Sequence, residues 1–275
     1  MKGNIIYTKT IPGKDPEYAP FPENLHPDII SFLDRQHIQT LYTHQAETFQ
    51  HAMERRNVVI TTPTASGKSL CFYLPVIQEI LQHPFTRALF IYPTKALAAD
   101  QYWSLLPWME YLGEHRLSIG VYDGDTTPDE RKWIRERANI ILTNPNMLKG
   151  SMLPNHSRYG FDFIFSNLKY IVLDELHVYR GAFGSNLSNI FRRLSRIYRY
   201  YHADPQFLCS LATIANPVEL AEKICGQSFV CVNKSGAGMS DRTYCLIQPP
   251  ERLDNNGNPY GRESVISVVA DLLRI

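Results

Sequence analysis

Short apolar runs recur along this chain, and longer amphipathic stretches separate them. The runs lie at Val58–Thr62, Ala88–Tyr92, Leu117–Val121, Ile140–Thr143, Tyr170–Leu173 and Phe207–Leu211. Near-continuous apolar runs are typical of strands that are buried on both faces, and the stretches between them have a helical period. The pattern predicts an α/β fold with a mostly parallel central sheet flanked by helices.

The two ends of the chain depart from this rhythm. Residues 1–40 hold five prolines among polar groups and predict an extended lead-in with a short helix around Pro27–Arg35. After Phe229–Val232 the alternation stops, and the following small polar residues are typical of a linker. The last part predicts a strand, a loop and an uncapped helix, at Arg242–Ile247, Pro249–Gly261 and Ser264–Ile275.

These changes divide the chain into four predicted regions. They are a lead-in over 1–40, one large domain over 41–232, a linker over 233–241 and the truncated start of a second domain over 242–275. A chain of 275 residues has room for one large domain and a fraction of another.

Composition excludes several classes of protein. Hydrophobic residues make up 44% of the chain and charged residues 20%, which is enough apolar surface for a packed core. The net charge of +1 leaves nucleic-acid binding to a local patch. The five cysteines are odd in number and form no CxxC pair, so we expect reduced thiols and a cytoplasmic protein without a zinc site. No signal peptide or membrane-spanning run is evident.

A loop rich in hydroxyls follows the first buried run and leads into a helix from Leu70. Its residues are Thr62, Pro63, Thr64, Ala65, Ser66, Gly67, Lys68 and Ser69. Strand, loop, Gly-Lys-Ser and helix form the context of a phosphate-binding loop. Lys68 would reach the β- and γ-phosphates of ATP, and Ser69 would ligate Mg²⁺. The full pattern has Gly where Thr62 stands, and the alternative is a chance Gly-Lys-Ser at a helix start.

Acidic residues follow another buried run, Tyr170–Leu173. Asp174 and Glu175 stand at its carboxyl end, where ligands bind in open α/β sheets, and His177 follows them. Asp174 would hold Mg²⁺, and Glu175 would polarise the attacking water. His177 would relay between this site and a neighbouring domain. Standing alone, the box would be an ordinary solvated turn, but the phosphate loop favours the catalytic interpretation.

Together these motifs resemble a superfamily 2 DExH-box helicase, with a RecA-like motor domain. The resemblance implies that Gln45, 17 residues before Thr62, recognises adenine. It also implies contacts to a nucleic-acid backbone from three further segments, whose residues are Pro93, Thr94, Lys95, Asp123, Gly124, Thr143, Asn144 and Pro145. Hydroxyls and backbone N–H groups at helix starts suit such phosphate contacts. For each segment alone, a plain turn and helix cap is an equal alternative.

The run Leu173–Asn186 and the later Ala212–Pro217 are similar to a subgroup of DNA-repair helicases, the bacterial mitomycin-repair helicases and their eukaryotic relatives. The resemblance implies ATP and Mg²⁺ as cofactors, single-stranded DNA as partner and 3′-to-5′ translocation. It implies a second RecA-like domain in cis. It also assigns Ala212 and Thr213 to the coupling of hydrolysis to strand separation.

Two departures from the family pattern stand against full activity. Leu211 occupies the place of a serine in the coupling motif, and the arginine-bearing motif of a second motor domain is missing. We therefore expect ATP binding with slow hydrolysis by this chain alone. The alternative is a non-catalytic ATP- and DNA-binding module. A small-molecule kinase is disfavoured, because it would not explain Gln45 or the backbone-contact segments.

Aromatic and basic residues outside the motifs have plainer interpretations. Trp103 and Trp108 are expected in the core, and the role of Trp133 stays open. Four arginines at helical spacing predict a solvated face, or a basic face toward DNA or another domain. They are Arg192, Arg193, Arg196 and Arg199.

Overall fold

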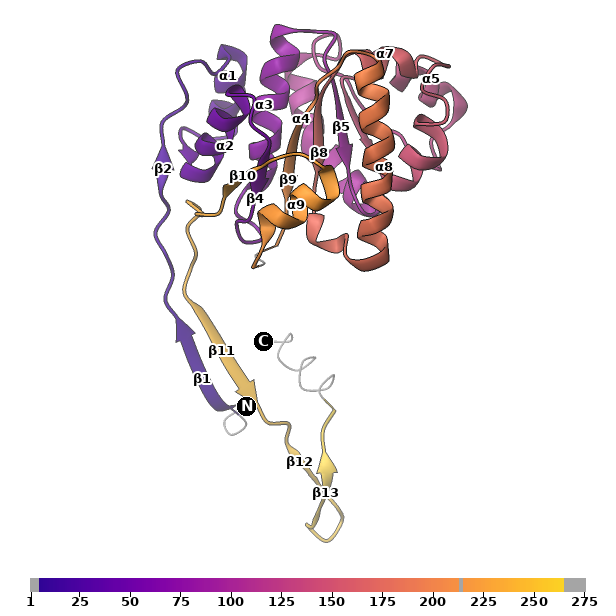
Figure 1. Ribbon diagram of the computed structural model, residues 1–275. Coiled ribbons are helices and arrows are strands. Elements are labelled where there is room, and N and C mark those ends of the chain that lie inside the picture. Colours follow the sequence, from indigo (N-terminus) through magenta and orange to yellow (C-terminus); the bar gives the residue numbers. More distant parts are fainter. Residues whose placement is uncertain (1–4, 213–214, 265–275) are drawn as a thin grey trace. The chain divides into compact units, whose positions relative to one another are not determined.

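The computed structural model describes residues 5–212 and 215–264 (Figure 1). By their contacts these residues divide into two compact units. The larger, unit 2, spans Glu17–Ala237, and unit 1 consists of the described parts of Met1–Pro16 and Gly238–Ile275. Each unit is described separately below.

A seven-stranded sheet in the order β10-β4-β9-β8-β5-β7-β6 forms the centre of unit 2. All neighbouring strands run parallel, so the predicted fold is confirmed. The strands are β4 (Val58–Ile60), β5 (Arg87–Ile91), β6 (Ile119–Val121), β7 (Ile140–Thr143), β8 (Leu168–Leu173), β9 (Gln206–Ser210) and β10 (Val230–Val232). The seventh, β10, lies where the sequence rhythm breaks, and it pairs with β4.

Successive side chains of each strand enter opposite cores. Val58 and Ile60 pack into one apolar cluster, and Val59 between them packs into the other. This follows from the two-residue period of a strand, and it explains why both faces needed apolar residues. Each fully buried side chain of this size contributes about 1.5–3 kcal/mol of burial free energy.

Helices cover both faces of the sheet (Figure 1). One core is lined by α1 (Pro27–Arg35), α2 (Thr43–Met53), α3 (Lys68–Gln82) and α4 (Lys95–Leu112). The other is lined by α5 (Pro128–Arg137), α7 (Phe161–Ser166), α8 (Gly181–Tyr200) and α9 (Pro217–Cys225). Shorter elements are α6 (Pro145–Met147), η1 (Leu148–Met152), η2 (Leu176–Val178), and the paired β2 (Tyr18–Ala19) and β3 (Leu41–Tyr42).

The predicted short helix in the lead-in is confirmed as α1. Pro27 occupies its first turn, where a missing N–H costs nothing, and the His26 side chain accepts a hydrogen bond from Asp28 N. Ile29, Phe32 and Leu33 bury its apolar face at spacings of three and four.

Unit 1 contains two antiparallel strand pairs. β1 (Ile5–Ile11) pairs with β11 (Arg242–Ile247). The strand predicted at 242–247 is confirmed as β11. β12 (Glu251–Leu253) pairs with β13 (Pro259–Arg262). The prediction of a loop over 249–261 was therefore wrong, because this segment forms most of a hairpin. Asp254 closes the turn of the hairpin by accepting hydrogen bonds from Asn256 N and Asn258 N.

The helix predicted over 264–275 lies outside the described residues, apart from Ser264. The interpretation of 242–275 as the start of a second RecA-like domain, and the boundaries at 41 and 233, remain predictions.

Candidate functional site

The predicted site residues follow the carboxyl ends of neighbouring parallel strands. Because the strands are parallel, these ends share one edge of the sheet. The phosphate loop follows β4, the acidic box follows β8, and Ala212 follows β9, which lies between them. The segments at 93–95, 123–124 and 143–145 follow β5, β6 and β7, at the other half of the sheet. We call the half of the edge at β4, β9 and β8 the nucleotide side and the half at β5, β7 and β6 the backbone-contact side, after the contacts predicted for them.

The phosphate loop is closed on itself. Gly67 adopts φ 77° as the N-cap of α3, a left-handed conformation that suits glycine. The Thr62 hydroxyl, fully buried, lies 2.7 Å from the Ser66 hydroxyl. Lys68 Nζ donates to Thr62 O at 3.1 Å. Thr62, the departure from the glycine pattern, therefore braces the loop from inside, while Pro63, Thr64 and Ala65 are exposed.

Gln45 connects the phosphate loop to α2. Its Nε2 donates to Gly67 O at 2.9 Å, and its Oε1 accepts from Tyr42 N at 2.9 Å. A Cβ on residue 67 would lie only 2.7 Å from this Nε2, so the glycine is required for the contact. Each carboxamide atom retains capacity for one further hydrogen bond. Adenine recognition by Gln45 therefore stays a prediction that its bonding capacity allows.

Asp174 is held by groups on two strands. Ser210, the last residue of β9, donates its hydroxyl to Asp174 Oδ1, and Glu175 N donates to the same oxygen at 3.0 Å. Glu175 adopts φ 54°, a backbone conformation that is uncommon for residues other than glycine. Strained conformations of this kind occur often at functional sites. Sequence reasoning missed Ser210, although its place one residue before Leu211 was a usable signal.

The donor set at this edge fits Mg²⁺. The Ser69 hydroxyl and the Asp174 carboxylate supply oxygens, which Mg²⁺ prefers, and nucleotide phosphates and water commonly complete its shell. Tyr73 lies one turn beyond Ser69 on α3, and its pKa is raised to about 12 by burial, with a smaller contribution from the Asp174 charge. The Ser69 hydroxyl lowers the pKa of Tyr73 in turn, so the Tyr73 hydroxyl lies near both Ser69 and Asp174.

His177 connects the acidic box to the coupling motif. Its Nδ1 lies 3.1 Å from Ala212 N and 3.1 Å from Glu175 Oε2. One nitrogen cannot serve both at once: without a hydrogen Nδ1 accepts from Ala212 N–H, and with one it donates to Glu175. His177 thus lies between the acidic box and the coupling motif. Thr213, the other predicted coupling residue, lies outside the described residues.

Leu211 does not face the site. Its side chain is fully buried in the second core, and its backbone N–H donates to Ile60 O at 3.0 Å. The strand alternation directs the neighbouring Ser210 the other way, onto Asp174. A hydroxyl that contacts the acidic box therefore comes from Ser210, one position before Leu211.

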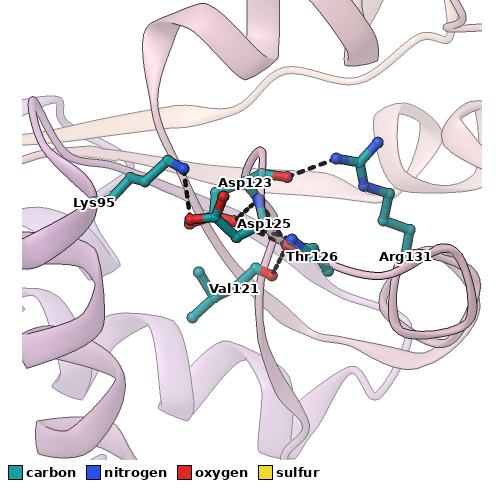
Figure 2. Close-up of polar contacts among 6 residues, drawn as sticks. All are labelled: Lys95, Val121, Asp123, Asp125, Thr126 and Arg131. Atoms are coloured by element: carbon teal, nitrogen blue, oxygen red, sulfur yellow. Dashed lines mark hydrogen bonds and ion pairs between the residues drawn. The ribbon is translucent and has the colours of Figure 1, made fainter.

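On the backbone-contact side, Lys95 is paired. Its Nζ lies 2.7 Å from Asp125 Oδ2, and both side chains are exposed (Figure 2). The Asp125 hydrogen bond raises the pKa of Lys95. Asp123 shapes the turn that presents Asp125, because its Oδ1 accepts from Asp125 N at 2.8 Å. Arg131 anchors that turn by donating to Asp123 O at 2.8 Å.

Two helix caps complete this side. Thr94 caps α4 by accepting from Leu97 N, and Asn144 caps α6 by accepting from Met147 N. Thr143 is buried, and its hydroxyl donates to Tyr122 O at 2.8 Å. Thr94 and Lys95 are exposed, Asn144 is half-buried, and Gly124 is exposed beside Lys95. The accessible polar groups therefore come from the two helix starts and the turn between them.

The predicted burial of the tryptophans holds for one of two. Trp108 is 2% exposed and packs with Phe32, as predicted. Trp103 is 65% exposed, so its predicted place in the core was wrong. The period of α4 turns residue 103 away from the face that Leu105 and Trp108 bury.

Among the described residues, no helix is long and apolar enough to cross a membrane.

Comparison with known proteins agrees with this geometry. A family model described as DEAD/DEAH box helicase matches residues 42–221. The ATP-dependent helicase YprA of Bacillus subtilis is 43% identical over 252 residues, which cover 91% of this chain and 33% of that protein. The ATP-dependent helicase hrq1 of Schizosaccharomyces pombe is 34% identical over 268 residues, covering 96% of this chain and 25% of that protein.

A solved structure is similar over nearly the whole chain. The crystal structure of the DUF1998 helicase MrfA bound to DNA matches with a TM-score of 0.89 and 40% identity. The match covers 99% of this chain and 38% of that one. This chain therefore spans 33% of the length of YprA, 25% of hrq1 and 38% of the MrfA chain.

Proposed function

This chain belongs to the DEAD/DEAH box helicase family, and from that premise we propose that it is the ATP-binding motor domain of a DNA helicase or translocase. It would bind Mg²⁺-ATP on the nucleotide side of the sheet edge and the backbone of a single DNA strand on the other side. A role in DNA repair, a second RecA-like domain in cis and a cytoplasmic location belong to the same proposal.

One observation carries the proposal. The phosphate loop after β4, Ser210 at the end of β9 and Asp174 after β8 lie on three adjacent strands, and Ser210 joins the last two by a hydrogen bond. A chance Gly-Lys-Ser tripeptide would not be accompanied by a braced carboxylate on the adjoining strands. This arrangement supports phosphoryl transfer over a plain solvated turn.

Each nucleotide-side residue would have a distinct task. Lys68 would leave Thr62 O and neutralise charge on the β- and γ-phosphates. Ser69 and Asp174 would hold Mg²⁺, which supplies further charge neutralisation when bound. Glu175 would orient and polarise the attacking water. Gln45 would hold the loop through Gly67 and offer its remaining bonding capacity to adenine.

The backbone-contact side offers groups that suit phosphates. Thr94 and Asn144 stand at helix starts, where N–H groups and the helix dipole favour anions, and Lys95 adds a mobile cation. Such contacts carry no base information, as a translocating motor requires. The DNA in the MrfA structures supports DNA as the partner by analogy.

The test is ATP turnover with and without single-stranded DNA, using Lys68→Ala as the inactive variant. We expect slow turnover that single-stranded DNA raises, and about a 100-fold loss of that turnover in Lys68→Ala because phosphate charge is left unneutralised. Lys149→Ala, an exposed lysine in η1, is the matched control and should retain turnover. Turnover that survives in Lys68→Ala would contradict the proposed site.

A second candidate, a non-catalytic ATP- and DNA-binding module, is favoured by Leu211 in the coupling motif. Fluorescent-nucleotide binding separates the two. Tight nucleotide binding without turnover, with and without DNA, would support the module, and Lys68→Ala would then weaken binding alone.

A further inference from the structure

Three segments that are distant in sequence meet at the start of α2. Glu17, where the chain enters unit 2, donates its N–H to Gly236 O at 2.8 Å. Glu17 O accepts from Thr43 N at 3.1 Å. Gly236, one residue before unit 2 ends at Ala237, donates its N–H to His44 Nδ1 at 3.2 Å. Both chain connections between the units therefore pass through this junction.

Gly236 is packed too tightly for any side chain. A Cβ there would lie 2.6 Å from Glu17 O and 2.7 Å from Thr43 N, and it would also collide with Thr43 Oγ1. Such distances are below van der Waals contact, so a substitution has to separate the segments. The junction is therefore a specific contact between the exit of unit 2 and the first residue of α2.

The same helical turn holds the phosphate loop. Gln45 joins Tyr42 N to Gly67 O, and the Tyr42 ring stacks on His44 with centroids 5.8 Å apart and 12° between the ring planes. Tyr42–Gln45 therefore contacts the loop on one side and the Gly236 exit on the other. The two contacts are made by adjacent residues, Gln45 and His44.

His44 lies between these contacts and is fully buried. Its Nδ1 serves Gly236, while its buried Nε2 makes no normal hydrogen bond to any residue in the described ranges. Burial lowers the pKa of His44, the Ser66 backbone opposes this, and the nearby Lys68 ammonium lowers it further. A neutral imidazole with one nitrogen on the exit thus stands within electrostatic reach of the phosphate loop.

We propose that Tyr42–Gln45 couples occupancy of the phosphate loop to the Gly236 exit, with His44 as the positioning residue. The inference rests on the proposed function of this loop as an ATP site. When phosphates take Lys68 from Thr62 O, the groups beside His44 and the Gly67 carbonyl held by Gln45 are disturbed. Because Nδ1 accepts from Gly236 N–H, that change reaches Gly236. By thermodynamic linkage, a change at Gly236 alters the free energy of nucleotide binding by the same amount.

Amide hydrogen exchange on the whole chain tests this, with and without Mg²⁺-ADP and a non-hydrolysable ATP analogue. In the unsubstituted chain, nucleotide should change exchange at 233–238 as well as in the phosphate loop. His44→Phe keeps the ring stacked on Tyr42 but removes both nitrogens. It should abolish the response at 233–238 while nucleotide still protects the loop. His51→Phe, on the same helix away from the junction, is the matched control.

A second variant changes Gly236 itself, at the exit end of the proposed coupling. Gly236→Ala should separate the segments and weaken binding of a fluorescent ADP by about fivefold, through the same coupling. Gly150→Ala is its control, because a Cβ at 150 has no neighbour within 4 Å among the described residues. His44→Asn, whose amide oxygen stands near the place of Nδ1, should retain the Gly236 contact and with it part of the response to nucleotide at 233–238.

The outcomes separate the two proposals. Nucleotide binding without any change at 233–238, or a full response in His44→Phe, would overturn the coupling and leave the proposed function intact. Unchanged ADP affinity in a folded Gly236→Ala would overturn it as well. Absence of nucleotide binding to the unsubstituted chain would instead remove the proposed function, and the coupling with it.

Discussion

Ser210 shows how one hydroxyl can fix the position of the carboxylate that we propose as a Mg²⁺ ligand. It donates to Asp174 Oδ1, the oxygen that also accepts from Glu175 N, so it restricts the rotation of the proposed Mg²⁺ ligand. We predict that Ser210→Ala lowers kcat for ATP hydrolysis by about 3- to 10-fold, as expected from losing one hydrogen bond to a charged group. Steady-state kinetics at saturating Mg²⁺ would measure this.

A positioning role for Ser210 can be distinguished from general damage. Ser210→Thr retains a hydroxyl at the end of a strand, where a β-branched residue is well tolerated, and should recover most of the lost kcat. Nucleotide affinity should change little in either variant. A Ser210→Ala protein with normal kcat, or with its whole loss in affinity, would contradict this role.

Asp125 pairs with Lys95, a residue that we propose contacts nucleic acid. Their ion pair, with 2.7 Å between Nζ and Oδ2, occupies a cation that stands beside a helix start (Figure 2). We predict that Asp125→Asn tightens single-stranded DNA binding about two- to fivefold at low salt, because the lysine is released and one negative charge is removed. The gain should shrink as salt rises, since exposed charges are screened.

Fluorescence anisotropy with a labelled oligonucleotide, repeated over a salt series, measures the effect. Asp129→Asn makes the same change in net charge, in the first turn of α5 and outside the Lys95–Asp125 pair. It separates release of Lys95 from the charge change alone. Equal tightening in the two variants would show that the ion pair itself has no influence on binding.

At the scale of elements, α3 and α4 are joined across the site. Tyr73 on α3 donates its hydroxyl to Gln101 on α4 at 2.7 Å. α3 begins at the phosphate loop and α4 begins at Lys95, so this bond connects the helices that start on the two sides of the sheet edge. A helix moves as a rigid element, and a bond between two helices can transmit small shifts.

We predict that Tyr73→Phe lowers the factor by which DNA stimulates ATP turnover, while turnover without DNA is retained. Its free energy of unfolding should fall by about 1 kcal/mol, the usual value of one hydrogen bond. Tyr102→Phe removes a hydroxyl from the same part of α4 and serves as the control. Full stimulation in Tyr73→Phe would argue against transmission through this bond.

The strands of the central sheet that the sequence predicted share one property. Each consists of apolar residues on both faces, and the predicted run at Ile140–Thr143 matches β7 at both ends. β10 was missed because it is short and only partly buried as an edge strand, so its apolar signal is weak. The β12–β13 hairpin was missed because its strands are exposed and its turn depends on the Asp254 side chain.

In the candidate site, too, the sequence predicted local features but not tertiary contacts. The sequence predicted that the phosphate loop and acidic box follow strands, and parallel pairing brings those strand ends to one edge. It did not predict Ser210 on Asp174 or His44 on Gly236, which join residues 36 and 192 positions apart. Such contacts depend on tertiary packing, and neither local period nor motif spacing carries that information.

At the scale of the whole molecule, the two sides of the sheet edge meet where β8 adjoins β5. Asp174 N lies 3.4 Å from Ile91 O there, so the last residues of the two strands remain in register beside the acidic box. Nucleotide-side and backbone-contact residues are thus built on one continuous sheet, whose strands pack into both cores. A change that loosens that core should affect both sides together.

His44 allows the stability of this core to be tested by pH. Its pKa is lowered, chiefly by burial, with the Ser66 backbone opposing and Lys68 adding to the effect. The folded chain keeps the imidazole neutral where the unfolded chain, with a pKa near 6.5, takes up a proton. The stability contribution is therefore fully present above about pH 6.5 and is lost as the pH falls below it.

Carboxylates titrate in a lower window. Hydrogen bonds from Thr127 lower the pKa of Glu130, and Lys223 lowers that of Glu219, so both stay charged in the folded chain until the pH is below 4.5. We predict that Tm falls by about 2–4 °C between pH 6.5 and 5, and that His44→Phe removes much of this fall. Differential scanning fluorimetry between pH 6.5 and 5 measures this. An equal fall in Tm for the unsubstituted chain and for His44→Phe would assign the acid sensitivity to other groups.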